Sequence, residues 1–283
     1  MAAISRAERK NLGLFFLIAF AWAWLLLLPR ILATANWFTL PGWLSFFLST
    51  IAAFGPFVAA FALTYWNEGQ AGISSLWRRG WEYRFQKKWL APTLLLAPVV
   101  AVLAVLVVML AGENIDWKLA PPALTLFPVF MLIFFTSAFP EEFGWRGYVL
   151  DRFQLRWNAL ASSLILGVIW GLWQLPLHFI AGTTQHTIPI WDFVVQTIVV
   201  TIAYTWLYNN TGGSILVAML FHAANSFTAA VIPLWTSDVG RWIHLALMLL
   251  VVGAIVFIWG PKTLVRKTKA PVTSADVEPT GGI

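Results

Sequence analysis

Two adjacent glutamates, Glu141 and Glu142, follow Pro140 and stand among aromatic residues, an unusual setting for acidic side chains. Arg146 lies four positions after Glu142, and this spacing predicts a helical ion pair between them. Neighbouring helical residues differ by about 100° in direction, so Glu141 is predicted to point elsewhere. A carboxylate removed from water readily takes a proton from a water molecule. The alternative is an ordinary helix start at a membrane interface, where proline and acidic residues are common.

A second polar cluster lies in the segment 170–179. Gln174 and His178 are four residues apart, so they are predicted to share one face of a helix. Pro176 stands between them and is expected to kink the helix and free a backbone carbonyl nearby. The alternative for His178 is an interfacial histidine near the outer end of a membrane span.

A third cluster begins at His222, which lies in an apolar, small-residue helical segment with Asn225 and Ser226 three and four positions on. Such polar groups often form a structural hydrogen bond between membrane helices, which is one interpretation. Histidine is also a proton shuttle and the commonest side-chain metal ligand, which is the other.

Three other ionisable residues lie in or near the predicted spans, and their positions do not indicate a catalytic role. His186 and His244 are predicted in outer loops or at the edge of a span, and Asp192 is predicted as a cap or dipole partner at a helix start.

Together these side chains match the requirements of hydrolysis by an activated water molecule. A carboxylate takes the proton, a metal ion or imidazole polarises the carbonyl, and an amide stabilises the oxyanion. The candidate metal ligands are Glu141, His178 and His222, and a divalent ion such as zinc is the candidate cofactor. The chain has no cysteine, which excludes a thiolate metal site and a cysteine nucleophile.

The elements that position these clusters are predicted to be membrane helices. The chain of 283 residues is 60% hydrophobic and 11% charged, whereas soluble domains carry about 25% charged residues. A span needs about 20 apolar residues, and open strands cannot satisfy their backbone groups in lipid. The sequence predicts an all-α polytopic protein with eight spans, near residues 11–29, 43–66, 89–110, 124–139, 159–180, 191–208, 214–234 and 242–259.

The spans form one predicted transmembrane domain over residues 1–264, with a core at 124–234 and a disordered cytoplasmic tail at 265–283. Fifteen of the eighteen basic residues fall on the side of the two termini, which predicts that both termini are cytoplasmic. The basic residues of the cytoplasmic loops account for the net charge of +6, so no nucleic-acid partner is predicted. The predicted location is a prokaryotic plasma membrane, crossed several times.

The three clusters resemble the motifs of the CPBP (CAAX protease and bacteriocin-processing) family of intramembrane endopeptidases. This family includes type II CAAX prenyl endopeptidases and bacterial Abi proteins. Its first motif, Glu-Glu-x-x-x-Arg, is matched by Glu141, Glu142 and Arg146. Its second motif is an aromatic residue, three others and His, and its third is His, three others and Asn. The resemblance covers residues 124–234. It implies that Glu141 activates water, that histidines position water or metal, and that an amide stabilises the oxyanion.

Two positions depart from these motifs. Gln174 stands where the family has its first histidine, and glutamine cannot shuttle a proton and is a poor ligand for transition metals. Ser226 stands at the usual asparagine position, and Asn225 comes one residue early. His178, one turn beyond Gln174, substitutes for the missing histidine only if the helix shifts or the kink at Pro176 redirects the side chain.

Three functions remain as hypotheses. The first is an endopeptidase that cleaves a hydrophobic, lipidated or membrane-proximal peptide at the bilayer. The second is a catalytically impaired member of the same fold that acts as a membrane scaffold or peptide-binding regulator. The third is a small-solute transporter, which is disfavoured because the sequence shows no inverted repeat.

Overall fold

The computed structural model describes residues 6–117 and 120–266, and these residues form helices without strands. The α-helices are α1 (Arg6–Thr34), α2 (Gly42–Ala53), α3 (Gly55–Arg79), α4 (Leu90–Leu110), α5 (Leu126–Ile133), α6 (Phe139–Gly144), α7 (Asp151–Arg156), α8 (Ala159–Trp173), α9 (Ile190–Asn210), α10 (Ile215–Val231) and α11 (Asp238–Trp259). π-Helical segments Phe134–Ala138 and Trp145–Leu150 join α5 to α6 and α6 to α7. Short 3₁₀ turns occupy Lys87–Trp89, Ala123–Thr125, Leu175–Phe179, Gln185–Thr187 and Pro233–Thr236.

The all-α polytopic membrane fold is confirmed, with a correction to the number of long spans. Seven helical stretches of the described residues are long and apolar enough to cross a membrane, rather than eight. The seventh predicted span is α10, whose 17 residues measure about 25 Å, less than the roughly 30 Å hydrocarbon core. Most of the predicted tail lies outside the described residues, and the domain boundaries stay a prediction.

The fourth span was expected to end at Phe139, and this expectation is wrong. One helical stretch runs through Ala123–Arg156 and contains α5, α6 and α7. Pro140 has no N–H and clashes with the preceding turn of a regular α-helix. The wider π-helical turn just before it accommodates that defect. Glu141 and Glu142 therefore lie inside a continuous helix, and not at a helix start facing water.

The second predicted span is interrupted and extended. The break at Phe54 separates α2 from α3, and α3 continues to Arg79, beyond the predicted end at residue 66. Within α3, Gly69 has a φ of 64°, which glycine adopts without strain. The predicted spans at α1, α4, α9 and α11 differ from the observed helices mainly in their ends.

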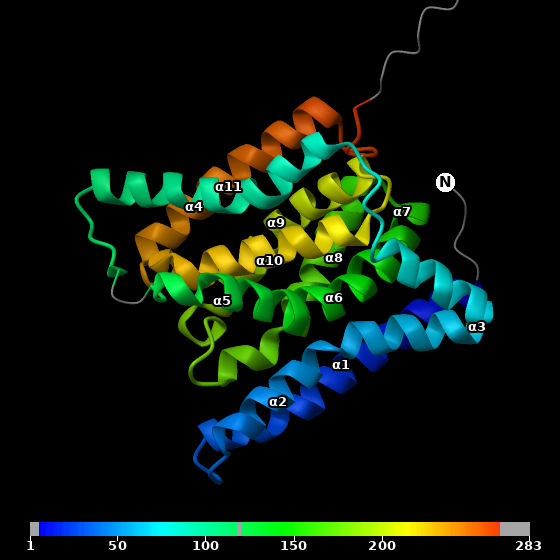
Figure 1. Ribbon diagram of the computed structural model, residues 1–283, viewed down its shortest axis with the longest axis horizontal. Coiled ribbons are helices and arrows are strands. Elements are labelled where there is room, and N and C mark those ends of the chain that lie inside the picture. The colour runs from blue at the N-terminus through cyan, green and yellow to red at the C-terminus, as the bar shows by residue number, and fades with distance from the viewer. Residues whose placement is uncertain (1–5, 118–119, 267–283) are drawn as a thin grey trace, which may run out of the picture.

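Figure 1 shows how these helices are layered. α1, α2 and α3 lie along one side of the bundle, α4 and α11 lie along the opposite side, and α5, α6, α8, α9 and α10 fill the middle. α1 packs on α3, α3 on α6, α8 on α9, and α10 on α4, α5 and α9. The start of α1 and the end of α11 lie at the same end of the bundle, which is called the terminal end below.

Candidate active site

Glu142 and Arg146 form the expected ion pair inside the bundle. The Oε1 atom of Glu142 accepts a hydrogen bond from Nη1 of Arg146 at 2.8 Å, and neither side chain has exposed area. The guanidinium lies over the ring of Tyr204 at 3.8 Å and over the ring of Trp170 at 4.6 Å. These cation–π contacts stabilise a charge that burial would otherwise penalise.

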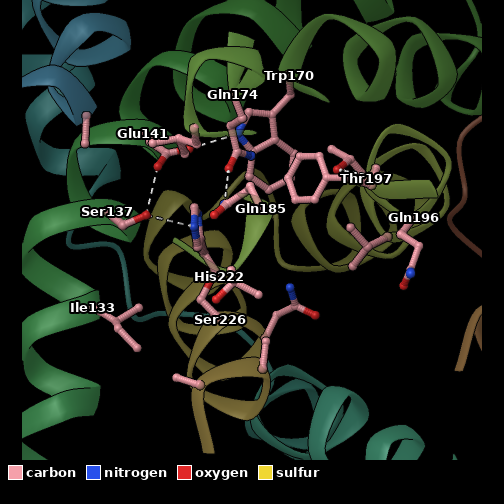
Figure 2. A pocket seen from close by; sticks show the side chains of 18 of the residues that line it. Ile133, Ser137, Glu141, Trp170, Gln174, Gln185, Gln196, Thr197, His222 and Ser226 are labelled. Atoms are coloured by element: carbon pink, nitrogen blue, oxygen red, sulfur yellow. Dashed lines mark hydrogen bonds between the residues drawn. The ribbon is translucent and has the colours of Figure 1, made fainter. Parts of the chain in front are cut away.

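Glu141 points away from that ion pair, as its position one residue earlier predicts. Its carboxylate accepts a hydrogen bond from the Ser137 hydroxyl on Oε1 and one from the Trp170 indole on Oε2, each at 2.8 Å (Figure 2). The residue is 5% exposed, and it forms no ion pair with any described residue. Each carboxylate oxygen keeps a second lone pair, so the group is oriented and remains able to accept a proton.

His222 connects the two glutamates. Its Nδ1 lies 2.8 Å from Oε1 of Glu142, and its Nε2 lies 3.2 Å from Oγ of Ser137. Because a carboxylate only accepts hydrogen bonds, Nδ1 carries the proton. Ser137 was missed by the motif comparison. It lies four residues before Glu141, but the predicted helix ended between them, so no shared face was expected.

The three predicted clusters meet at one cavity of about 450 Å³, within the usual size range of ligand sites. Glu141, Gln174, His222, Asn225 and Ser226 line it, whereas Glu142 and Arg146 lie behind its wall. The rest of the lining is mainly apolar, and no lysine or arginine among the described residues contributes to it. The Asn225 and Ser226 side chains form no hydrogen bond within the described part of the chain, so both remain available to a ligand.

Gln174 directly follows α8 and lines this cavity. Its Oε1 accepts a hydrogen bond from Nε2 of Gln185 at 3.1 Å (Figure 2). The Gln174 amide nitrogen has no hydrogen-bond acceptor among the residues described, so it is free to donate. Gln185 lies in the loop between α8 and α9. No helical spacing relates it to the three clusters, so it was not predicted as a site residue.

His178 does not enter the cavity. The 3₁₀ turn Leu175–Phe179 begins after Gln174 and contains Pro176, so the two residues no longer share a helical face. The ring Nδ1 of His178 lies 3.2 Å from the Ile188 carbonyl oxygen, and the ring packs edge-on against Phe193 at 5.2 Å. Phe193 lines the cavity, and His178 lies behind it.

The residues present do not fit the metal site expected from Glu141, His178 and His222. Within residues 6–117 and 120–266, no group of three or more histidine, aspartate, glutamate or cysteine side chains is placed to hold a metal ion. Glu141 and His222 leave only hydroxyl and amide groups to complete the set, and zinc sites usually take three or four histidine, cysteine or carboxylate ligands.

Two residues treated as peripheral lie inside the bundle. Asp192 is not a simple cap, because its carboxylate pairs with Arg241 at 2.8 Å and both side chains are buried. His244 is also buried, and it lines the cavity. Each lies within the first two turns of its helix, but neighbouring helices cover that level of the bundle.

A polytopic helical bundle with an oriented, buried carboxylate on an apolar cavity defines a candidate intramembrane hydrolase. A family profile described as "Type II CAAX prenyl endopeptidase Rce1-like" matches residues 122–228. "CAAX prenyl protease 2" of Methanococcus maripaludis is 35% identical over 101 residues, which is 34% of this chain and 37% of that protein. Residues 122–228 of the chain are thus similar to CAAX protease-like membrane proteins, and the aligned part spans little more than a third of the archaeal relative. The matched segment runs from the start of the fourth span almost to the end of α10 and contains the whole site around Glu141.

Proposed function

We propose that the protein is a CAAX prenyl protease-like intramembrane endopeptidase in which Glu141 activates a water molecule. The observation that carries the proposal is the difference between the two glutamates. Glu142 is held by Arg146 and His222, whereas Glu141 receives two neutral hydrogen bonds and faces the cavity. The coarser part of the proposal rests on the family, and the Glu141 mechanism rests on this geometry.

In the proposed reaction, a water molecule in the cavity gives one proton to Glu141, and its oxygen attacks the carbonyl carbon of the peptide bond. The carbonyl oxygen becomes an oxyanion, and the protonated Glu141 then donates its proton to the leaving amine nitrogen. The carbon–nitrogen bond breaks, and the products are a carboxylic acid and an amine. Glu141 therefore serves as base and then as acid.

The oxyanion needs hydrogen-bond donors that are already in place. The side-chain amides of Gln174 and Asn225 both line the cavity with an uncommitted N–H₂ group, and they are the proposed donors. Gln174 can donate a hydrogen bond but cannot carry a proton, so Glu141 alone moves protons in this scheme. Ser137 and Trp170 act as positioning residues that fix the direction of the Glu141 carboxylate.

The cavity also bears on the class of substrate. Its mainly apolar lining suits a hydrophobic or lipidated peptide near the membrane, and the name of the archaeal relative points to a prenylated protein. Phe46 of α2 lines the cavity and is 54% exposed, so the cavity reaches the surface of the bundle beside α2. A substrate held in the bilayer would enter there.

The test is cleavage of a fluorogenic library of hydrophobic and prenylated peptides by protein purified in detergent. Glu141→Gln keeps the shape of the side chain but removes the base, so activity should fall by about 100-fold or more. The matched control is Glu113→Gln, at an exposed residue after α4, and it should retain the wild-type rate. Equal rates for Glu141→Gln and wild type would overturn the proposal. A wild type that binds peptides but cleaves none would instead favour the impaired, scaffold-type member of the family.

A further inference from the structure

The cavity has a second polar region on the side away from Glu141. Gln196 of α9, His244 of α11 and Trp235 of the turn Pro233–Thr236 line it there. Figure 2 shows Gln196 across the cavity from Glu141 and Ser137. His244 and Trp235 also lie beyond residue 228, where the match to the family ends. The proposed reaction uses none of these three side chains.

A hydrogen-bonded chain leads from a buried ion pair to this region. Arg241 donates from Nε to Oδ2 of Asp192 at 2.8 Å, and Nε2 of Gln196 donates to the other oxygen, Oδ1, at 2.9 Å. Oε1 of Gln196 lies 3.2 Å from Nδ1 of His244. Asp192, Arg241 and His244 are 3%, 6% and 7% exposed. Arg241 also pairs with Asp238 and donates to the Trp235 carbonyl oxygen, so its position is fixed from several sides.

The chemistry of this chain determines which nitrogen of His244 carries the proton. A carboxylate only accepts hydrogen bonds, so Gln196 must turn its N–H₂ group toward Asp192 and its oxygen toward His244. That oxygen also only accepts, so Nδ1 of His244 must carry the hydrogen. The ring is neutral, because no carboxylate contacts it and the nearby Asp192 is already paired with Arg241. Nε2 is then an acceptor with no hydrogen-bond donor among the described residues.

We propose that His244 Nε2 is the acceptor of a second binding subsite, which takes an uncharged hydroxyl or amide donor of the substrate. This proposal rests on the proposed function, because it places the donor on a peptide whose scissile bond lies at Glu141. The ligand is uncharged because no lysine or arginine of the described chain lines the cavity and the second region holds no free carboxylate. A ligand that carries the matching donor gains one hydrogen bond to this acceptor, and an analogue that lacks the donor does not.

The first experiment needs no substrate. Nitrogen-15 NMR of histidine-labelled protein in detergent distinguishes the two neutral tautomers and the imidazolium, and the His244 signal is identified by its loss in His244→Phe. We expect the Nδ1–H tautomer at neutral pH, and a loss of that preference in Gln196→Leu. A ring protonated on Nε2, in either the neutral or the charged form, would overturn the inference whether or not the protein is a peptidase.

The second experiment measures binding in the Glu141→Gln background, where no peptide is consumed. The probes are uncharged, fluorescent nonapeptides of leucine and alanine in which each alanine in turn is replaced by serine. At one position serine should tighten binding about threefold or more, the typical effect of one net hydrogen bond. His244→Phe should abolish this preference. The matched control is His186→Phe, at an exposed histidine that does not line the cavity, and it should keep the preference.

The outcomes separate this inference from the proposed function. Peptides that show the serine preference but are not cleaved by the wild type would overturn the proposed function and leave the subsite standing. Peptides that are cleaved without any serine preference would do the reverse. No saturable binding of any peptide would overturn the subsite. If His244→Phe does not purify as a folded protein, Gln196→Leu takes its place. This variant keeps the imidazole ring but removes the hydrogen-bond acceptor that holds the proton on Nδ1.

Discussion

At the scale of single residues, burial separates the two glutamates more sharply than their sequence positions do. Glu142 is the inner member, and it accepts hydrogen bonds from both Arg146 and His222. Its charge thus holds a proton on Nδ1 of the imidazole, and Nε2 lies beside Ser137, next to Glu141. The two adjacent glutamates therefore have different environments. Glu142 forms an ion pair with Arg146, and Glu141 forms none with any described residue.

Loss of Arg146 should destabilise the protein strongly. Arg146→Leu leaves the Glu142 carboxylate buried without its cation, which typically costs about 3–5 kcal/mol. Glu142→Gln added to Arg146→Leu should recover part of that loss, because the amide is neutral. Thermal unfolding in detergent checks both variants. The matched control, Arg84→Leu at an exposed arginine, should change stability by less than about 0.5 kcal/mol. A similar loss at both arginines would contradict a specific role for the buried pair.

Gln174 should limit the reaction rate, because it lines the cavity where the family motif has histidine. Gln174→His supplies a group that can both donate and carry a proton, and acid–base groups typically contribute about 100-fold or more. We expect cleavage of the peptide library to rise at least tenfold. Gln86→His, at an exposed glutamine before α4, is the control and should leave the rate unchanged. A rate that stays the same or falls in Gln174→His would mean that the present site already works best with an amide.

Spacing predicted the site well where residues lie within one or two helical turns. The Glu142–Arg146 pair follows from its spacing of four residues alone. His178 was placed wrongly, because its direction depends on the 3₁₀ turn around Pro176. Ser137 and His244 were not identified, because their importance depends on residues from other helices, and one sequence contains no direct signal of such contacts.

At the scale of elements, the close packing of α3 on α6 fixes the depth of Glu141. A Cβ atom added at Gly144 would lie 2.4 Å from Cβ of Pro56 and 2.6 Å from its carbonyl oxygen. Those distances are far inside van der Waals contact, and one of the contacted atoms belongs to the backbone. Gly144 therefore allows the helix that carries the two glutamates to lie directly against the start of α3.

Gly144→Ala should push α6 away from α3. We expect a loss of about 1–3 kcal/mol in the free energy of unfolding, the usual effect of overpacking, together with reduced cleavage because Glu141 moves. Gly253→Ala on α11 is the matched control, since nothing lies within 4 Å of its added Cβ. It should be neutral or stabilising by about 0.5–1 kcal/mol, because alanine favours the helix. Equal stability and activity in the two variants would argue against the close contact.

Hydropathy predicted that every span is helical, because the bilayer leaves few alternatives. Hydropathy did not predict correctly where helices end or continue near proline and glycine, since these residues can end, kink or interrupt a helix. Pro140 was taken as a helix end, but the neighbouring π-helical segments keep the helix continuous. The segment 54–56 was predicted to lie in the interior of a helix, but the helix is interrupted at Phe54, between α2 and α3. Which outcome occurs depends on packing against other helices.

At the scale of the whole molecule, the segment that is similar to known proteins does not contain all the residues that line the cavity. The family match covers the segment that carries Glu141, Gln174 and His222. The cavity also takes residues from α1, α2 and α11, which lie outside that match. The residues around Glu141 thus lie within the matched segment, whereas part of the cavity wall lies outside it.

The two termini should face the cytoplasm, and this arrangement can be tested because the chain has no cysteine of its own. Lysine and arginine collect on the cytoplasmic side, and fifteen of the eighteen basic residues are predicted on the side of the two termini. Arg146 no longer counts in this argument because it is buried in an ion pair. In intact cells, a membrane-impermeant maleimide should label Glu113→Cys, after α4, but should not label Lys10→Cys or Lys262→Cys.

Lysis should expose Lys10→Cys and Lys262→Cys to the reagent, and the three sites are exposed on the protein itself. The reverse pattern would invert the orientation while leaving the fold intact. Different results at positions 10 and 262 would place the termini on opposite sides of the membrane. Such a result would contradict the interpretation that α10 crosses the membrane together with the seven long spans. Eight crossings return the chain to its starting side of the membrane, whereas seven crossings do not.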